Sequence, residues 1–304
     1  MIRFLVNPSS GGGKGRRLLP RLRSLAAAAG AELVVSRDEQ ELRSQARLAV
    51  RQGVERLIVA GGDGTFHHAL QGLAGTDCAL GLVPLGRGND LAETLGVPPG
   101  LEESVERAVS GPIRPIDLGR VGDRYFAVYC GVGFDSEVAR FVHEKKGLAR
   151  GRAVYVYGVL RTLASFSPPV LEVEHDAGRF RGRAMFAVVS NCPCFGGGMR
   201  IAPSAEVVDG QLDLVILEEI SRLELLRVFP KVYRGRHTDH PAVTIVRTAR
   251  ARLAVDREMA MFGDGEPLLR LGVEPVEVEV APGALWVVVG NRRPRVAEPV
   301  GNPG

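Results

Sequence analysis

Three short glycine-rich stretches constrain the fold most, because each joins an apolar run to a segment with helical periodicity or turn character. The clearest is GGDGT at residues 61–65, between an apolar run at 56–60 and a helical pattern at 65–74. NPSSGGGKG at 7–15 and PLGRGND at 84–90 follow two other apolar runs. Short, continuously apolar strands are typical of a parallel sheet covered on both faces. We therefore predict a doubly wound α/β domain with these loops at one edge of its sheet.

The predicted elements of this first domain alternate along the chain. Strands are expected at 3–7, 32–36, 56–60 and 79–84, with helices at 16–29, 39–52 and 65–74.

The pattern changes after Pro112, where apolar and polar residues alternate as in the strands of an antiparallel sheet. Asp176, Ala177 and Gly178 separate two such runs and predict a hairpin turn. The second part of the chain therefore predicts an antiparallel β-sandwich interrupted by two helices. Its strands are expected at 125–132, 170–175, 183–190, 211–217, 249–255 and 276–280, and its helices at 153–166 and 221–233.

This division predicts two domains. We place the α/β nucleotide-binding domain at 1–115 and the β-sandwich domain at 116–283. The remaining segment, 284–304, contains an apolar run that is expected to return to the first domain, followed by a proline-rich tail.

Charge and composition exclude several classes of protein. The chain has 39 basic and 35 acidic residues, and this small excess, without interleaved basic and aromatic residues, argues against nucleic acid as a partner. No run approaches the roughly 18 apolar residues of a membrane span, and no signal peptide is evident. Cys78, Cys130, Cys192 and Cys194 lack metal or disulfide spacing and indicate free thiols. We expect a cytoplasmic protein that associates only transiently with a membrane.

The glycine stretches predict a nucleotide site. Glycines let the backbone approach phosphates, and Thr65 is expected to cap a helix whose N-terminus favours anions. Asp63 would repel phosphate unless a cation lay between them, so it indicates Mg²⁺. The simpler alternative is a glycine turn with an ordinary helix cap. NPSSGGGKG is not a Walker loop, because Gly15 follows Lys14, and the third loop lacks the last glycine of a dinucleotide fingerprint.

Acidic residues in the second part supply two further candidates. Asp264 and Glu266 flank a glycine, and either could accept a proton from a substrate hydroxyl as general base. Asp209 precedes a glycine before a predicted strand, where a metal ligand and an ordinary hairpin turn are both plausible.

The ordered set of NPxSG at 7–11, GGDGT at 61–65, PxGxGND at 84–90 and DGE at 264–266 resembles the diacylglycerol kinase catalytic-domain family, which includes sphingosine and ceramide kinases. The layout is most similar to the stand-alone bacterial lipid kinases, and the resemblance covers nearly the whole chain. It implies an N-terminal domain related to phosphofructokinase and NAD kinase, with ATP between it and the β-sandwich. The implied reaction is Mg²⁺-dependent phosphate transfer from ATP to a lipid hydroxyl, with diacylglycerol as the first expectation.

The resemblance also implies roles for individual residues. Asp264 or Glu266 would be the base. Asp209 would bind a structural magnesium ion, with Glu206 and Gln211 as flanking ligands. The residues expected to contact ATP are Asn7, Pro8, Ser9, Ser10, Gly11, Ser36, Gly61, Gly62, Asp63, Gly64, Thr65, Phe66, His67, Arg87, Asn89 and Asp90.

Arg87 departs from the family's motif, which usually has threonine there. Its guanidinium could contact phosphate, or it could mark a paralogue with altered nucleotide use. Arg87 therefore keeps a non-catalytic nucleotide-binding regulator as an alternative, and an NAD kinase-like enzyme is a second alternative because NAD kinases share the GGDGT element. The acceptor is open among diacylglycerol, a long-chain base, ceramide and a polyprenol, and a homodimer is one option for the oligomeric state.

Two weaker signals concern surfaces. His68 is expected on the surface of its helix. A basic stretch at 145–152 precedes an apolar helical segment and predicts peripheral contact with an anionic membrane, with a solvated loop as the alternative.

Overall fold

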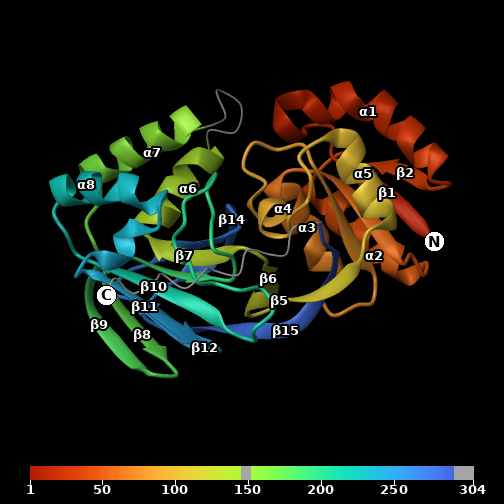
Figure 1. Cartoon of the computed structure of the whole chain (residues 1–304). Helices are drawn as coiled ribbons and strands as arrows, with labels where there is room; N and C mark the ends of the chain where they lie inside the picture. Colours follow the sequence, from red (N-terminus) through yellow and green to blue (C-terminus); the bar gives the residue numbers. More distant parts are fainter. Residues whose placement is uncertain (145–151, 291–304) are drawn as a thin grey trace, which may run out of the picture.

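The computed structural model describes residues 1–144 and 152–290 and consists of two lobes joined through one continuous sheet (Figure 1). The N-terminal lobe is α/β and the C-terminal lobe is a β-sandwich, as the sequence predicts. In Figure 1 the N-terminal lobe lies on the right and the C-terminal lobe on the left.

The N-terminal lobe is a parallel sheet with helices on both faces. Three of its four strands are buried because successive side chains point to opposite faces and both faces are covered, whereas the edge strand Glu32–Val35 is only half-buried. Leu57 packs with Leu70 on one face, and Ile58 packs with Leu22 on the other. The strands, in the order β2-β1-β3-β4, are β1 (Ile2–Val6), β2 (Glu32–Val35), β3 (Arg56–Gly61) and β4 (Ala79–Pro84), and the helices are α1 (Ser10–Ala28), α2 (Glu39–Arg51), α3 (Asp63–Leu73), α4 (Asp90–Thr94) and α5 (Leu101–Ser110).

Local sequence explains where the first helices begin. The Asp38 side chain accepts a hydrogen bond of 2.8 Å from the Glu41 backbone N–H and caps α2. The first turn of α1 contains Gly11, Gly12 and Gly13 with positive φ, so regular helix begins only after this loop.

The C-terminal lobe has two layers of antiparallel strands. β9 belongs to both layers, because its first half pairs with β8 and its second half pairs with β7 and β10. Helices cover one outer face. The elements are β7 (Tyr129–Gly133), α6 (Phe134–Glu144), α7 (Arg152–Ser165), β8 (Val170–His175), β9 (Gly178–Ser190), β10 (Leu212–Glu218), α8 (Arg222–Val232), η1 (Arg236–Asp239), β11 (Val243–Thr248), β12 (Arg250–Val255), β13 (Met259–Gly263) and β14 (Glu266–Leu271).

Two long strands connect the lobes. β15 (Val276–Val288) pairs with β12 at its start and with β4 of the N-terminal lobe near its end, where Val287 lies opposite Leu80. β5 (Ile113–Val121) runs antiparallel to β15 and continues into β6 (Arg124–Phe126). The predicted boundaries at 115/116 and 283/284 therefore fall inside strands.

One predicted strand is divided. Residues 125–132 form the end of β6 and most of β7, with a break at Ala127 and Val128. The backbone N–H groups of both residues donate to the Asp264 carboxylate instead of a neighbouring strand. The predicted hairpin at 176–178 is confirmed, since His175 pairs with Gly178 across a two-residue turn.

None of the helices within residues 1–144 and 152–290 is long and apolar enough to cross a membrane. The four cysteines are free thiols, as predicted, and three of them are buried.

Candidate active site

The three glycine-rich loops meet at the carboxyl edge of the parallel sheet. A Cβ atom added to Gly86 would lie 2.8 Å from Gly62 Cα, and one added to Gly11 would lie 2.2 Å from the Leu85 carbonyl oxygen. Only glycine permits these backbone contacts. The three loops therefore pack against one another through their backbones.

Hydrogen bonds join the first loop to the second. Asn7 Nδ2 donates to Thr65 Oγ1 at 3.1 Å, and Ser10 Oγ lies 3.1 Å from the same oxygen. The prediction that Thr65 caps its helix is wrong. α3 begins at Asp63 with Gly62 as its N-cap, and the Thr65 side chain is used to hold the neighbouring loop.

Two carboxylates lie between the second and third loops. Asp63 Oδ2 accepts a 2.7 Å hydrogen bond from the Asn89 backbone N–H, while the buried Oδ1 has no hydrogen-bond partner in the described residues. Burial, followed by the charge of Asp90, raises the pKa of Asp63 to about 7. Burial also raises the pKa of Asp90, which accepts from the Gly197 N–H at 3.2 Å. A divalent cation between these oxygens would offset both effects, so the pair fits Mg²⁺.

Asp264 is fully engaged in structural hydrogen bonds. Its Oδ1 accepts from the backbone N–H groups of Val128 and Tyr129 at 2.8 and 3.2 Å. Its Oδ2 accepts from the Ala127 N–H at 2.9 Å and lies 3.0 Å from His67 Nδ1. Both oxygens are therefore engaged, Oδ1 within the C-terminal lobe and Oδ2 also with His67 of the N-terminal lobe, which leaves Asp264 poorly placed to accept a substrate proton.

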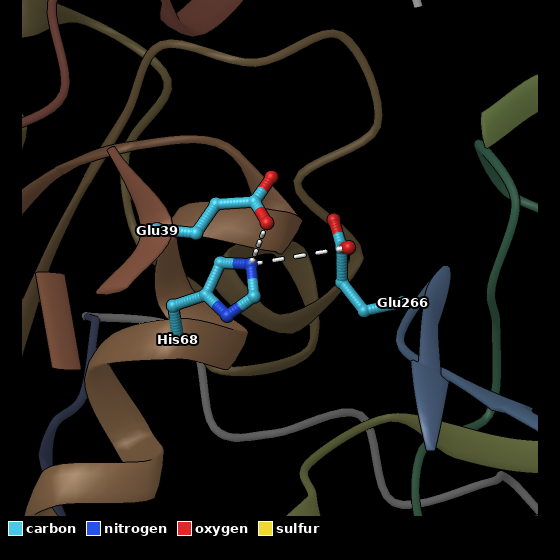
Figure 2. Close-up of side chains that lie close together, drawn as sticks. All are labelled: Glu39, His68 and Glu266. Carbon is cyan, nitrogen blue, oxygen red and sulfur yellow. Dashed lines mark ion pairs between the residues drawn. The ribbon is translucent and has the colours of Figure 1, made fainter. Parts of the chain in front are cut away.

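Glu266 has different surroundings. A Cβ atom added to Gly64 would lie 2.7 Å from Glu266 Oε1, so this oxygen lies directly against the GGDGT loop. Oε2 lies 3.8 Å from His68 Nε2 and 3.6 Å from His143 Nδ1. Figure 2 shows the carboxylates of Glu39 and Glu266 both facing Nε2 of His68. Of the two predicted candidates, Glu266 is the one that faces the loops.

These groups line a cleft of about 660 Å³ between the lobes. Five other predicted residues do not line it: Pro8, Gly61, Phe66, His67 and Asn89. The predicted residues on its wall are Asn7, Ser9, Ser10, Gly11, Gly62, Asp63, Gly64, Thr65, Arg87, Asp90, Asp264 and Glu266.

Ser36 and the predicted structural metal ligands lie outside the cleft. The buried Ser36 hydroxyl donates to the Val6 carbonyl at 3.2 Å. Asp209 Oδ1 accepts from the Gln211 N–H at 3.0 Å, and Oδ2 pairs with Arg247. An arginine at this carboxylate already neutralises it, so the metal role of Asp209, with half-buried Glu206 and exposed Gln211 nearby, stays a prediction.

The sequence did not predict the cleft's other wall. Ala139, Val142 and His143 come from α6, and Gly196 and Gly197 from a glycine run after β9 whose composition was a usable signal. The prediction that His68 lies on the helix surface is wrong, because it is only 3% exposed. The basic side chains predicted at 145–152 lie outside the part of the chain that the structure describes.

Comparison with known proteins identifies the family. Residues 1–121 match the family model described as Diacylglycerol kinase catalytic domain, and residues 127–289 match the one described as YegS C-terminal NAD kinase beta sandwich-like domain. A diacylglycerol kinase of Mycobacterium tuberculosis (strain H37Rv) is 31% identical over 306 residues, which cover 97% of this chain and 95% of that protein. The chain belongs to the diacylglycerol kinase catalytic-domain family. It is thus a member of a lipid kinase family, whose chemistry implies the use of ATP.

Other members agree with this assignment. A diacylglycerol kinase of Bacillus subtilis is 32% identical over 224 residues, 73% of this chain and 74% of that protein. A crystal structure of a diacylglycerol kinase from Bacillus anthracis has a TM-score of 0.74 at 19% identity, covering 95% of this chain and 97% of that one, and shows that the fold is shared.

Proposed function

We propose that this protein is an ATP- and Mg²⁺-dependent lipid kinase that transfers the γ-phosphate of ATP to the hydroxyl of diacylglycerol, giving phosphatidic acid. The observation that carries the proposal is the position of Glu266, whose Oε1 lies against Gly64 of the GGDGT loop inside the cleft. A carboxylate at that point can reach a hydroxyl brought to the phosphate. The relatives that are named diacylglycerol kinases support the choice of acceptor.

The loops would hold the phosphates of ATP. The N-terminus of α3 and the glycine backbone supply N–H groups and a positive dipole end for anions. Asp63 and Asp90 would hold Mg²⁺ through the oxygens described above. When bound there, the ion neutralises charge that develops on the transferring phosphoryl group. The exposed Arg87 lies on the same wall, where its guanidinium can face phosphate oxygens.

Glu266 would act as the general base. Its carboxylate accepts the proton of the acceptor hydroxyl as the hydroxyl oxygen forms a bond to the γ-phosphorus. The bond between that phosphorus and the bridging oxygen breaks, and ADP leaves with the electron pair. Most of the rate enhancement would come from positioning and charge neutralisation.

A second hollow of about 890 Å³ adjoins the cleft, since Tyr233 lines both. Its wall carries Lys231, Arg234 and Arg236 against a single acid, Asp239. α7 and α8 flank it and share a buried cluster. Their exposed apolar side chains are Val156, Tyr157, Leu160, Leu223 and Leu226.

We propose that this face makes transient contact with an anionic membrane surface. Apolar side chains beside cations suit the boundary between headgroups and acyl chains. A lipid could then reach the cleft at Tyr233 without leaving the bilayer completely.

The test is a transfer assay with purified protein, Mg²⁺ and ATP labelled at the γ-phosphate. The acceptors are micelles of diacylglycerol, sphingosine, ceramide or undecaprenol, with NAD in a separate reaction. Label in diacylglycerol is the expected result. Label in another lipid would correct the acceptor, and label only in NAD, or none despite ATP binding, would overturn the lipid kinase proposal.

A further inference from the structure

Two consecutive histidines of α3 face the two carboxylates of the turn between β13 and β14. His67 Nδ1 lies 3.0 Å from Asp264 Oδ2, and His68 Nε2 lies 3.8 Å from Glu266 Oε2. Both imidazoles are buried. The buried side chain of His68 in the N-terminal lobe therefore lies next to Glu266, the candidate base, in the C-terminal lobe.

The proton of His68 can be assigned from its other neighbour. Arg43 of α2 donates from Nε to His68 Nδ1 at 3.3 Å. A guanidinium has no acceptor, so Nδ1 must be the nitrogen without hydrogen. The hydrogen then lies on Nε2, which faces both Glu39 Oε2 at 3.4 Å and Glu266 Oε2 at 3.8 Å (Figure 2).

The same three side chains, Glu39, His68 and Glu266, also have the composition of a metal site, since their ligand atoms lie within 4.8 Å of one another. An imidazole that binds a metal normally donates its other N–H to a carboxylate, carbonyl or water. His68 Nδ1 instead receives a hydrogen bond from a cation. This arrangement opposes metal binding at Nε2 and favours a donor role toward the carboxylates.

We infer that His68 is a positioning residue for the base, holding Glu266 Oε2 so that Oε1 faces Gly64. His143 of α6 flanks the same Oε2 at 3.6 Å and limits its movement from the other lobe. The separation of 3.8 Å is longer than a hydrogen bond, and such contacts tighten in the substrate complex. The inference rests on the proposed lipid kinase function.

Arg43 affects the base only indirectly, through His68. Because Arg43 donates a hydrogen bond to Nδ1 of His68, the hydrogen of the imidazole stays on Nε2, the nitrogen that faces Glu266. Without Arg43 the imidazole could place its hydrogen on Nδ1 and turn a lone pair toward the carboxylate, which would repel Oε2. His68 and Arg43 should therefore behave as one unit.

The experiment measures kcat and KM for ATP and for dioctanoylglycerol in micelles, together with the ATP dissociation constant. The variants are His68→Leu, which removes the donor, His68→Gln, which keeps an N–H near the position of Nε2, and Arg43→Met with its double mutant with His68→Leu. His175→Gln, in the distant β8–β9 hairpin, is the matched control.

His68→Leu should lower kcat roughly 10–100-fold, the cost of a misplaced catalytic group, and leave the ATP dissociation constant unchanged. His68→Gln should restore much of kcat. Arg43→Met should also lower kcat, and the double mutant should lose no more than His68→Leu alone.

Wild-type kcat that survives His68→Leu, or additive effects of the two substitutions, would overturn the inference while leaving the kinase proposal intact. Wild-type protein without lipid phosphorylation would instead overturn the proposed function. Calorimetric binding of one Zn²⁺ ion that is lost in His68→Leu would replace the positioning role with a metal site.

Discussion

Asp264 and Glu266 are two residues apart and differ in what surrounds them. Asp264 accepts four contacts from Ala127, Val128, Tyr129 and His67, whereas Glu266 faces the glycine loop. We therefore assign the two carboxylates different roles, a structural one for Asp264 and that of the proposed base for Glu266.

Asp264→Asn tests the structural purpose. Asparagine tolerates the positive φ of 53° found there, so the backbone is not disturbed. Its amide NH₂ would face N–H groups that the carboxylate now satisfies, at a cost of about 1–3 kcal/mol for each unsatisfied donor. We expect a clearly lower urea midpoint for this variant. A midpoint equal to that of the wild type would contradict the structural assignment.

Asp135, at the start of α6, makes stability depend on pH. Both of its oxygens are buried, and this burial raises its pKa from 3.8 to about 7 against the smaller, opposing effect of contacts with Ser136. Between these values the folded protein keeps a proton that the unfolded chain has lost. Stability therefore falls as the pH rises from about 4 to about 7, by roughly 4 kcal/mol at most, and then levels off.

Asp135→Asn should remove this dependence. The free energy of unfolding of the variant minus that of the wild type should be larger at pH 8 than at pH 4. Urea unfolding at both pH values measures this difference. The difference between the two proteins isolates Asp135 from Asp63, Asp90 and Asp213, whose pKa values are also raised by burial. An equal difference at both pH values would refute the account of this residue.

At the scale of elements, the loops after β3 and β4 depend on a contact between two glycines. Gly86→Ala would place a methyl group 2.8 Å from Gly62 Cα and 2.6 Å from Asn89 Oδ1. We expect the loops to separate and the ATP dissociation constant to rise about tenfold, which corresponds to roughly 1.4 kcal/mol.

Gly272→Ala is the control for this prediction, because a Cβ atom there would meet nothing within 4 Å. Its ATP affinity should match that of the wild type. Calorimetry measures the ATP dissociation constant of both variants. An unaltered dissociation constant in Gly86→Ala would show that the contact between the loops is not needed for ATP binding.

The elements predicted best from sequence are those of the N-terminal lobe, whose apolar residues are covered by elements close to them in the sequence. β4 has the bounds that the sequence predicts, and α2 differs from its prediction by one residue at its end. The strand predicted at 125–132 is broken because its N–H groups bond to Asp264, some 135 residues away. A partner so distant leaves no signal in the local pattern.

The same reason limits prediction of the site. The motif residues around Gly62, Asp63 and Glu266 could be recognised because four motifs occur in the order typical of one family. His68 could not be placed correctly, because its neighbours Arg43, Glu39 and Glu266 come from α2 and from the other lobe, far from it in the sequence. Residues from α6 carry no motif and reach the cleft only through tertiary packing.

At the scale of the molecule, the proposed membrane face should govern binding to lipid. Leu223 and Leu226 on α8 are 68% and 40% exposed. Replacing both with serine removes apolar surface worth roughly 1.5–3 kcal/mol for each side chain if fully buried. We expect binding to vesicles of phosphatidylcholine and phosphatidylglycerol to fall at least tenfold in sedimentation assays.

Val273→Ser is the matched control, since this residue is 71% exposed after β14 and away from α8. It should bind vesicles as the wild type does. Vesicle binding that falls equally in Val273→Ser and in the double variant, or that does not fall in the double variant, would show that another surface contacts the membrane.

The proposed function requires the cleft to transfer phosphate to a lipid hydroxyl with Glu266 as the base. The most direct test is single-turnover phosphorylation of dioctanoylglycerol by the wild type and by Glu266→Gln, with Mg²⁺ and saturating ATP. We predict transfer by the wild type, a rate lower by roughly 10²–10⁴-fold in the variant, and equal ATP affinity in both. Transfer at the wild-type rate by Glu266→Gln would show that Glu266 is not the base.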